Sequence, residues 1–545
     1  MGVTFALVSL FLLSVSWVSC YAASIHEDFG QCMSEHLTGK PHPTENIFTP
    51  DSPTYKSRYD AAQQNTRWVN STVPLPKPTL ILMPNNESQI QAAVLCSRQL
   101  GLQIRVKSGG HDYEGQSYLS KTPFIIIDLV NMRSIDINVE EQTAWVQTGA
   151  TLGELYYNIG TRTNTLAFPG GLCPSVGTGG HISGGGLGVL LRKFGLAADN
   201  VIDASIVDVN GRILDRKTMG EDLFWAIRGG GGASFGVILS WKLKLVQIPA
   251  TVTYFNIGVF GIENVTKLVY KWQRIAHKLP KDLFIRGLVA TKKTLDENKV
   301  IKDKTIKVQF ESLFLGSKWD LIPLLNKTFP ELGVKQEDLQ EMTWVHAAAF
   351  RLGGGDETEN TLDMVLLNRT DIYRSSYKGK SDFVTTPISP EGLEGIWEKF
   401  LEEDTQVYMI IDPFGGQMDN ISKSALPFPH RKGTLYNIQY LVKWYNNNAT
   451  TYSRHQKWMK DLYEYMAPYV SQSPRAAYLN YKDLDLSSNQ VGNTSYAQAK
   501  VWGEKYFKGN FERLARVKSM VDPSNFFRNE QSIPLLPTKG TKQFH

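Results

Sequence analysis

The chain has 545 residues, of which 42% are hydrophobic and 20% are charged. This length exceeds what one hydrophobic core organises, so two or more domains are expected, and the apolar content excludes a globally disordered chain. The net charge is +5, but no dense block of Lys and Arg occurs, which argues against a nucleic-acid-binding protein.

The first 23 residues form an apolar run that ends in the small residues Ala22 and Ala23. This pattern predicts a secretory signal peptide over 1–23, although the segment lacks a strongly basic start. A signal anchor is the alternative, but the run is short for a membrane span and no later stretch is long enough to cross a bilayer. The mature chain is therefore expected in the secretory pathway, with the apoplast or the vacuole as its destination.

Between residues 79 and 249 the sequence predicts short strands alternating with helices. Asn86 is the expected N-cap of the first helix and Gly101 its C-cap. Asn210 and Gly211, set between two apolar runs, predict a hairpin over 206–214. Strands are expected over 79–83, 102–110, 124–130, 144–150 and 236–249, and helices over 86–101, 151–162 and 221–232.

After Pro249 the pattern changes to a second region that mixes helices and strands. The tail over 502–527 is expected to form one helix that stops at Pro523. No internal repeat or low-complexity tract interrupts the region. Helices are expected over 264–279 and 452–466, and strands over 305–316, 406–413 and 435–445.

Glycine concentrates at 108–115, 170–186, 228–236 and 413–416. Glycine admits positive φ and lets backbone amides approach a ligand closely, and rows of such amides suit a pyrophosphate. The four clusters favour a dinucleotide or another phosphorylated cofactor, although neither a Rossmann GxGxxG nor a P-loop is present. A tight turn explains each cluster alone but explains all four together less well.

Cysteines and glycosylation signals both fit a secreted protein. Loss of the signal peptide removes Cys20, and Cys32 and Cys96 are then expected to form a disulfide in an oxidising compartment. Cys173 is the odd one out, which suggests a special role or an intermolecular bond, and no metal site is expected. Eight Asn-x-Ser/Thr sequons predict a glycoprotein, at Asn70, Asn86, Asn264, Asn326, Asn368, Asn420, Asn448 and Asn493.

Four segments resemble motifs of the berberine bridge enzyme-like family: "RVKSGGHDYEGQS", "FPGGLCPSVGTGGHISGGG", "YLNYKDLDL" and "WGEKYFKGNFERLARVKSMVDPSNFFRNEQSIP". The family belongs to the vanillyl-alcohol-oxidase-type flavoproteins and includes the cannabinoid acid synthases. The resemblance covers nearly the whole mature chain, with the motifs in the expected order.

The resemblance implies an α+β fold with two lobes. An FAD-binding, PCMH-type domain is expected over 24–248 and an antiparallel-sheet substrate-binding domain over 249–477. A C-terminal berberine-bridge segment over 478–536 would complete the FAD domain, with a tail over 537–545. The substrate would enter between the lobes of a monomer.

In this family the histidine of SGGH and the cysteine of GGxCP both bond to the isoalloxazine ring of FAD, which carries over to His111 and Cys173. Cys173 would then be a cofactor anchor rather than an unattached or dimerising thiol. Two tethers fix the ring without deep burial, leave room for bulky substrates and raise the flavin's potential. His181 is expected to have a structural rather than a catalytic part. The other expected FAD contacts are Ser108, Gly109, Gly110, Gly177, Gly179, Gly180 and Asn480, with Tyr478 beside them.

The family's catalytic base is the second tyrosine of the YxNY motif, which is Tyr481 here. A tyrosine with a pKa of ~10 acts as a base only where a nearby cation or the flavin stabilises its phenolate. Arg286 resembles a family position that supplies such a charge. Gln439 resembles another active-site position, and Asn437 is placed in the substrate pocket. Packing is the alternative for Tyr481, but its motif favours the catalytic role.

Oxygen is the expected second substrate. The residue three positions after the attachment cysteine lies near the oxygen-reactive face of the flavin in this family, and a small side chain there opens a pocket for oxygen. Val176 occupies that position and favours an oxidase, with packing of the loop as the alternative. Leu187 and Phe414 stand where many relatives have tyrosine, which makes the site less polar and favours an apolar, prenylated phenolic or aromatic alcohol.

These residues together predict a secreted FAD-dependent oxidase of a plant specialised metabolite, with or without oxidative cyclisation, that passes electrons to oxygen and makes hydrogen peroxide. Its partners would be a small-molecule substrate and oxygen, with no nucleic acid and no membrane span after signal removal. The alternatives are a flavin-containing pericyclase of the Diels–Alder type, a carbohydrate oxidase, and a defence or storage protein with a vestigial flavin. Intact His111, Cys173, Val176 and Tyr481 count against the pericyclase, and no attachment residue or base is lost as a vestigial site would allow.

Overall fold

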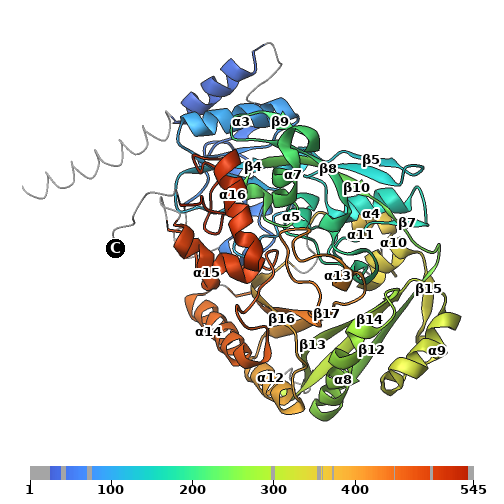
Figure 1. Cartoon of the computed structure of the whole chain (residues 1–545). Helices are drawn as coiled ribbons and strands as arrows, with labels where there is room; N and C mark the ends of the chain where they lie inside the picture. Colours follow the sequence, from blue (N-terminus) through green and yellow to red (C-terminus); the bar gives the residue numbers. More distant parts are fainter. Residues whose placement is uncertain are drawn as a thin grey trace, which may run out of the picture.

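The computed structural model of the chain describes residues 25–38, 45–69, 76–295, 301–352, 357–358, 360–370, 374–446, 448–490 and 495–537. Three larger sheets divide these residues into two lobes (Figure 1). The first lobe contains a four-stranded and a five-stranded sheet, and the second contains one seven-stranded antiparallel sheet. The predicted α+β class with an antiparallel second domain is confirmed. Within the described parts of the chain, no helix is both long and apolar enough to cross a bilayer.

The four-stranded sheet is partly parallel, because β4 pairs in parallel with both of its neighbours. Helix α3 (Glu87–Gln99) packs its apolar side chains with those of the sheet, and the Asn86 side chain accepts a hydrogen bond from Gln89 N as the expected N-cap. The helix ends at Gln99 with Leu100 as its C-cap, one residue before the predicted Gly101, which follows with φ 69°. In sheet order the strands are β1 (Ile47–Phe48), β2 (Leu80–Leu82), β4 (Phe124–Asp128) and β3 (Gln103–Lys107), and α2 (Tyr55–Ala61) precedes β2.

A disulfide fixes the start of the described chain to this sheet. Cys32, in a helix over 25–36, is bonded to Cys96 of α3 with an S–S distance of 2.04 Å. Both cysteines are buried in the same apolar cluster as the four-stranded sheet. The predicted disulfide is therefore confirmed, whereas the predicted signal peptide lies outside the described residues.

The five-stranded sheet is antiparallel, and the hairpin predicted around Gly211 is present between β8 and β9. Helix α7 begins at Arg216, earlier than predicted, because the Asp215 side chain caps it and Gly220 with φ 76° lets the chain kink inside it. The strands are β5 (Ile135–Asn138), β6 (Thr143–Gln147), β10 (Val237–Lys244), β8 (Val201–Val207) and β9 (Ile213–Leu214). The remaining elements are α4 (Leu152–Gly160), β7 (Leu166–Ala167), α5 (Thr178–Ser183), α6 (Leu191–Phe194), α7 (Arg216–Ile227) and β11 (Val246–Gln247).

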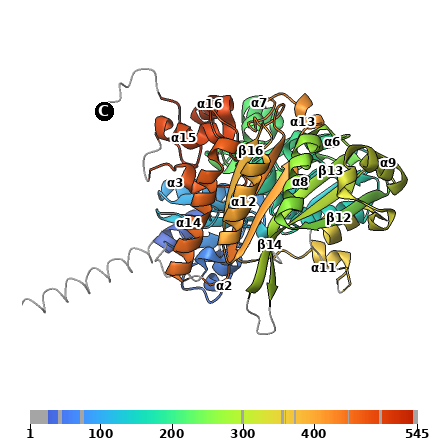
Figure 2. The same ribbon diagram turned by 90° about the horizontal axis from the view of Figure 1, so that it is seen from below.

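The seven-stranded sheet carries helices on one face only (Figures 1 and 2). Its strands, in sheet order, are β15 (Gln340–Met342), β12 (Val252–Phe260), β14 (Ile301–Phe314), β13 (Leu283–Leu295), β17 (Gln406–Pro413), β18 (Tyr436–Trp444) and β16 (Ser376–Val384). The helices of this lobe are α8 (Ile262–Ile275), α9 (Lys318–Thr328), α12 (Pro390–Glu402) and α14 (Ala449–Tyr465). The short helices α10 (Trp344–His346) and α11 (Leu362–Leu366) instead pack beside α4 of the first lobe, and α13 (Gln417–Asn420) packs beside α6 of the first lobe.

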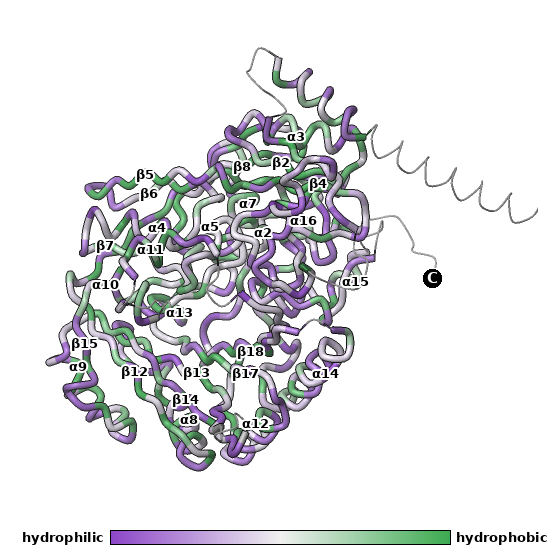
Figure 3. Tube along the Cα trace, turned by 180° about the vertical axis from the view of Figure 1, so that it is seen from behind, coloured by the Kyte–Doolittle hydropathy of each residue, from purple (hydrophilic) through white to green (hydrophobic). Residues whose placement is uncertain are grey.

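The other face of this sheet points toward the first lobe. Successive side chains of a strand lie on opposite faces, and Ile285, Ile411 and Ile438 belong to the core that α8, α12 and α14 cover. Their neighbours in the chain, such as Arg286 and Gln439, therefore lie on the face away from those helices. In Figure 3 the strands β2, β4 and β8 of the first lobe also run through hydrophobic (green) segments, so each lobe has its own apolar interior.

The chain returns to the first lobe at its C-terminal end, where α16 lies beside α7 (Figure 1). The buried Lys518 of α16 donates to Ser234 O at 2.7 Å, which fixes this segment to the glycine cluster at 228–236. The prediction of one helix over 502–527 is wrong: α15 (Tyr496–Phe507) and α16 (Phe511–Val521) are separate. Lys508 adopts φ 48°, a left-handed conformation that an α-helix does not accommodate.

Arg192 of α6 ties the two lobes together. Burial lowers its pKa to about 10, and no carboxylate is hydrogen-bonded to it within the described chain; it donates to carbonyls instead. The glycines of the 413–416 cluster make room for this contact, because a Cβ on Gly416 would lie 2.3 Å from Arg192 O and one on Gly415 would lie 2.0 Å from His277 O. This cluster therefore serves close approach between the lobes. The five carbonyls belong to His277, Leu279, Pro280, Leu283 and Phe414.

Candidate active site

The structure brings the two predicted attachment residues to one hydroxyl group. His111 lies in the loop after β3, and its Nε2 is 2.9 Å from Ser175 Oγ. Cys173 lies in the loop before α5, and its Sγ is 3.4 Å from the same oxygen. Both side chains are half-buried, so each keeps an accessible edge. The histidine and cysteine loops thus meet at Ser175, although some sixty residues separate them in the sequence.

Glycine is required where these two loops touch. A Cβ on Gly109 would lie 2.3 Å from Gly177 N, and one on Gly177 would lie 2.0 Å from Ser108 Oγ. Gly110 combines φ 74° with a position where a Cβ would lie 2.0 Å from Ala62 O. These distances leave no space for a side chain, so the loops pack backbone against backbone.

Two other predicted FAD contacts of the cysteine loop differ in their surroundings. A Cβ on Gly180 would meet nothing within 4 Å, and the residue is exposed. Gly179 instead packs near Thr148: a Cβ added to Gly179 would lie 3.0 Å from the Cβ of Thr148. Gly180 is thus the glycine of this pair that leaves backbone open to a ligand.

His181 and the YxNY motif hold the second half of the cysteine loop. His181 Nε2 accepts a hydrogen bond from Gly171 N at 2.9 Å, and burial lowers the pKa of His181 to about 4, so the ring is neutral. Asn480 Nδ2 donates to His181 O and to the Tyr478 hydroxyl, both at 2.9 Å. That hydroxyl also accepts from the backbone N–H groups of the loop at 186 and 187. These contacts support a structural part for His181, which stays a prediction.

Tyr481 lies between two other tyrosine rings. Its ring is stacked on Tyr113 with centroids 5.6 Å apart and meets Tyr478 edge-on at 4.9 Å. Burial raises the pKa of Tyr481 well above its ordinary value, and Tyr113 and Asp412 raise it further, whereas Arg286 lowers it. The phenol is therefore neutral unless a positive charge acts on it strongly.

Arg286 shares its charge with a carboxylate that the sequence reasoning did not single out. Its Nε lies 3.0 Å from Asp412 Oδ1, across the pairing of β13 with β17. Burial raises the pKa of Asp412 above its ordinary value, and Arg286 offsets only part of this rise. Asp412 is the first residue of the "DPFGG" segment, two positions before Phe414, the residue of this segment that was predicted to line the pocket.

Tyr113 is the second residue that the sequence reasoning missed. Besides stacking on Tyr481, its hydroxyl accepts a hydrogen bond from Gln439 Nε2 of β18. Gly379 of β16 leaves room for its ring, because a Cβ there would lie 2.6 Å from it. Tyr113 follows His111 by two residues in the same loop. It thus joins the histidine loop to both Tyr481 and Gln439.

The residues expected to line the substrate pocket lie at different depths. Phe414 is fully buried, with its ring edge-on to Phe383 and stacked on Phe428. Leu187 is 7% exposed and belongs to the same apolar cluster, against which the half-buried Val176 packs. Asn437 is also fully buried, and its Oδ1 has no hydrogen-bond partner among the described residues. The structure brings the apolar residues together in one core cluster, and their contact with a substrate stays a prediction.

The predicted glycosylation sites lie at the surface wherever the structure describes them. Asn86, Asn264, Asn326, Asn368, Asn420 and Asn448 are all exposed. Asn70 and Asn493 lie outside the described residues. Exposure is what glycosylation requires, and the modification itself stays a prediction.

Two family models match the chain. One, described as an FAD binding domain, covers residues 78–216, and the other, described as berberine and berberine like, covers residues 477–534. Berberine bridge enzyme-like 22 from Arabidopsis thaliana is 49% identical over 98% of this chain and 99% of its own length. Tetrahydroberberine oxidase from Berberis wilsoniae is 47% identical over 97% of both chains.

Solved structures share the fold over most of the chain. Berberine bridge enzyme-like 28 from Arabidopsis thaliana has a TM-score of 0.86 and 44% identity, covering 94% of this chain and 100% of its own. Wild-type Phl p 4, from a grass pollen, is described as a glucose dehydrogenase and has a TM-score of 0.86 and 43% identity over the same shares. A Phl p 4 variant with valine in place of isoleucine is described as a glucose oxidase. It has a TM-score of 0.85 and 44% identity, with the same coverage.

Proposed function

The chain belongs to the berberine bridge enzyme-like family of FAD-dependent oxidoreductases, and from that membership we propose that it is an oxidase whose FAD is bonded to both His111 and Cys173. The observation that carries the proposal is the meeting of two glycine loops, which brings His111 Nε2 and Cys173 Sγ to the hydroxyl of Ser175. Because both half-buried side chains reach the same hydroxyl group, His111 and Cys173 would be able to hold one flavin between them.

The chain's own residues supply proton transfer and orientation. When bound, FAD supplies the hydride acceptor and the route for electrons to oxygen. We assign Tyr481 as the base that takes the hydroxyl proton of the substrate at its phenolate oxygen, with Arg286 favouring that phenolate. Gln439 donates to Tyr113 through Nε2, which leaves its carbonyl oxygen to accept a hydrogen bond from the substrate.

Val176 supports oxygen as the electron acceptor. In Phl p 4, valine in place of isoleucine accompanies the change from a glucose dehydrogenase to a glucose oxidase. A double variant, also described as a glucose oxidase, carries a second substitution, to histidine, five positions after that valine. Val176 and His181 have the same identities and the same spacing here. We therefore assign Val176 to the position that admits oxygen, with hydrogen peroxide as the product.

Leu187 and Phe414 support an apolar phenol or aromatic alcohol, prenylated or not, as the substrate. Both lie in the largest apolar cluster, and neither offers a hydroxyl to a polar substrate. Oxidative cyclisation of such a phenol needs no further group beyond the base and the hydride acceptor. A pericyclase would not need Tyr481 as a base, and it would not need oxygen to reoxidise its flavin.

A carbohydrate oxidase is the second candidate. The observation in its favour is the description of Phl p 4 as a glucose dehydrogenase and, in a variant, as a glucose oxidase, at 43% and 44% identity. The polar groups of Arg286, Asp412 and Gln439 lie on one face of the seven-stranded sheet and would suit sugar hydroxyls. The exposed sequons support secretion for either candidate, to the apoplast or the vacuole.

The first test is reoxidation of the reduced flavin. The purified protein is photoreduced without air, mixed with oxygenated buffer and followed by stopped-flow absorbance. Return of the flavin absorbance within the dead time or within seconds supports the oxidase. Return over many minutes removes it and leaves a dehydrogenase or a pericyclase. Peroxide release is then compared for prenylated phenols, aromatic alcohols and glucose, and activity on glucose alone would contradict the apolar pocket.

A further inference from the structure

We propose that Lys378 is a positioning residue whose buried ammonium holds the loop that carries His111 against the loop that carries Tyr481. The inference rests on the proposed function for the roles of those two residues. Lys378 lies in β16, the edge strand of the seven-stranded sheet, and touches neither His111 nor Tyr481 in any described contact. Its effect would pass through one carboxylate on each loop.

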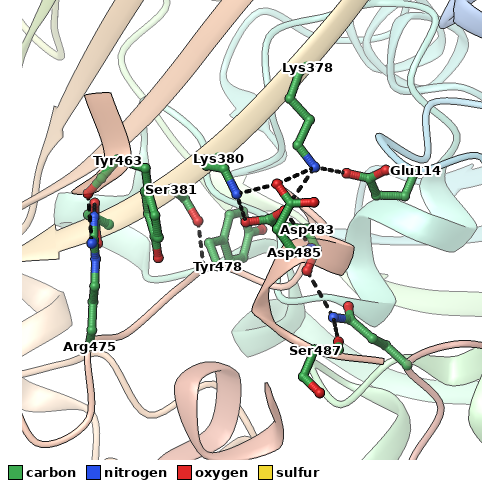
Figure 4. Close-up of polar contacts among 12 residues, drawn as sticks. Glu114, Lys378, Lys380, Ser381, Tyr463, Arg475, Tyr478, Asp483, Asp485 and Ser487 are labelled. Atoms are coloured by element: carbon green, nitrogen blue, oxygen red, sulfur yellow. Dashed lines mark hydrogen bonds and ion pairs between the residues drawn. The ribbon is translucent and has the colours of Figure 1, made fainter. Parts of the chain in front are cut away.

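The contacts of Lys378 reach both loops directly (Figure 4). Its Nζ is paired with Glu114 Oε1, three residues after His111. The same Nζ lies 2.9 Å from Asp483 Oδ1, two residues after Tyr481. The side chains of Lys378 and Asp483 are each 2% exposed and that of Glu114 is 7% exposed, so water screens these pairs little. One buried cation therefore connects segments that lie 369 residues apart in the chain.

The cluster is balanced in charge. Arg67 pairs with Glu114 at 2.6 Å, and Lys380 lies 2.7 Å from both Asp483 and Asp485. Burial alone would raise the pKa of Glu114, but Arg67 and Lys378 hold it below its ordinary value. The same surroundings lower the pKa of Asp485 to about 2, where Lys378 and Lys380 outweigh its burial. Three basic side chains thus face three acidic ones.

The direction of the side chains makes this cluster a support for the site rather than a part of it. Tyr113 points to Tyr481 and Gln439, whereas its neighbour Glu114 points into the cluster. Asp483 is further fixed by Gln531, whose Nε2 donates to its carbonyl at 2.9 Å. Groups that hold catalytic side chains from behind set their geometry to within fractions of an ångström.

The same strand also holds the start of the YxNY motif. Ser381, three residues after Lys378, accepts a hydrogen bond from Tyr478 N at 2.9 Å through its hydroxyl (Figure 4). Strand β16 therefore supports the loop that carries Tyr481 through Lys378, Lys380 and Ser381. Of these three residues, Lys378 is the one with a described ion pair to the histidine loop. Loss of the Lys378 charge should release the histidine loop and leave the Ser381 contact in place.

Lys380 is a matched control. It lies on the same strand, its side chain is 3% exposed, and it pairs with Asp483 and Asp485. No ion pair described in the structure joins it to Glu114. Lys378→Met and Lys380→Met therefore each remove one buried ammonium of the cluster, but the first also removes the link to the histidine loop.

The test compares hydrogen exchange in the holoprotein of the wild type and both variants. In Lys378→Met, exchange over 108–116 is expected to rise at least about threefold, whereas in Lys380→Met it stays at the wild-type level; exchange over 478–487 rises in both. In the same preparations, kcat of Lys378→Met should fall about tenfold with KM within about twofold, and less flavin should stay on the denatured protein. Equal exchange over 108–116 in the two variants would overturn the proposal.

A second variant and a flavin measurement allow the test to decide even if Lys378→Met does not fold or the protein holds no covalent flavin. If Lys378→Met does not fold, Glu114→Gln removes the charge from the histidine-loop side alone and should loosen 108–116 without loosening 478–487. Unchanged exchange over 108–116 in that variant also overturns the proposal. If the wild type holds no covalent flavin, the proposed function fails, while the exchange comparison still decides the part played by Lys378.

Discussion

Replacing Tyr481 by phenylalanine separates catalysis from stability, because the two rings differ by one oxygen. The stacking on Tyr113 and the edge contact with Tyr478 involve ring atoms that phenylalanine keeps. The Tyr481 hydroxyl makes no hydrogen bond to another described residue, so the free energy of unfolding should change by less than about 0.5 kcal/mol. Loss of the base should lower kcat about 10²- to 10⁴-fold, which is roughly 3–5 kcal/mol in the activation barrier.

Tyr478→Phe in the same motif is the control, and the opposite result is expected. The Tyr478 hydroxyl accepts hydrogen bonds from Gly186 N at 2.9 Å, from Leu187 N at 3.2 Å and from Asn480 Nδ2 at 2.9 Å. Its removal leaves two buried backbone N–H groups without an acceptor, at about 1–3 kcal/mol each. Unfolding should therefore become easier by roughly 2–6 kcal/mol in total.

The assay measures denaturant unfolding, flavin absorbance and peroxide release on the two variants in parallel. Tyr481→Phe should keep the wild-type unfolding midpoint and flavin content while it loses turnover. Turnover above about a tenth of the wild-type value would show that Tyr481 is not the base. Destabilisation of Tyr481→Phe as large as that of Tyr478→Phe would show that the contacts described for the motif are misassigned.

Three further predictions concern charge, oxygen and pH. The Asp412 carboxylate raises the pKa of Tyr481, so Asp412→Asn should move the rising limb of the pH–kcat profile to lower pH, and a shift to higher pH would contradict the electrostatic account. Val176→Ile adds one methylene and should slow flavin reoxidation by at least about tenfold with unchanged reduction by substrate, whereas an unchanged reoxidation rate would remove Val176 from the oxygen path. The pKa of His181 is about 4 when folded and 6.5 ordinarily, so its contribution to stability is complete above about pH 6.5 and is lost as pH falls toward 4, by about 3 kcal/mol. His181→Gln should flatten thermal unfolding against pH across that window, and the wild-type slope in the variant would refute this.

Local signals predicted individual elements well. Asn86 caps α3 as its position before an apolar run indicates, and the Asn210-Gly211 pair gives the β8–β9 hairpin. The prediction of one helix over the C-terminal tail was wrong because Lys508 adopts a positive φ, which helix propensity does not reveal. The strand order of the seven-stranded sheet could not be predicted either. Its adjacent strands β13 and β17 pair residues that lie more than a hundred positions apart in the sequence.

The candidate site also contains residues that local motifs predict and residues that only the fold reveals. His111, Cys173 and Tyr481 stand in motifs whose spacing is local. The structure brings His111 and Cys173 to Ser175 and stacks Tyr481 on Tyr113 of the histidine loop. Asp412 and Tyr113 were missed because each gains its meaning only from a partner on another element, Arg286 on β13 and Gln439 on β18. The ion cluster around Lys378 was missed although Glu114 and Asp483 lie in two of the quoted motifs, because only the fold brings Lys378 of β16 to both carboxylates.

The most direct test of the central claim is the mass of the flavin peptides. Trypsin should release residues 108–121, with His111, and residues 163–192, with Cys173. Double attachment predicts that these two peptides travel as one species that carries FAD, and that His111→Ala leaves flavin on the cysteine peptide alone. Two separate peptides without flavin, with the yellow colour released by acid, would contradict the account.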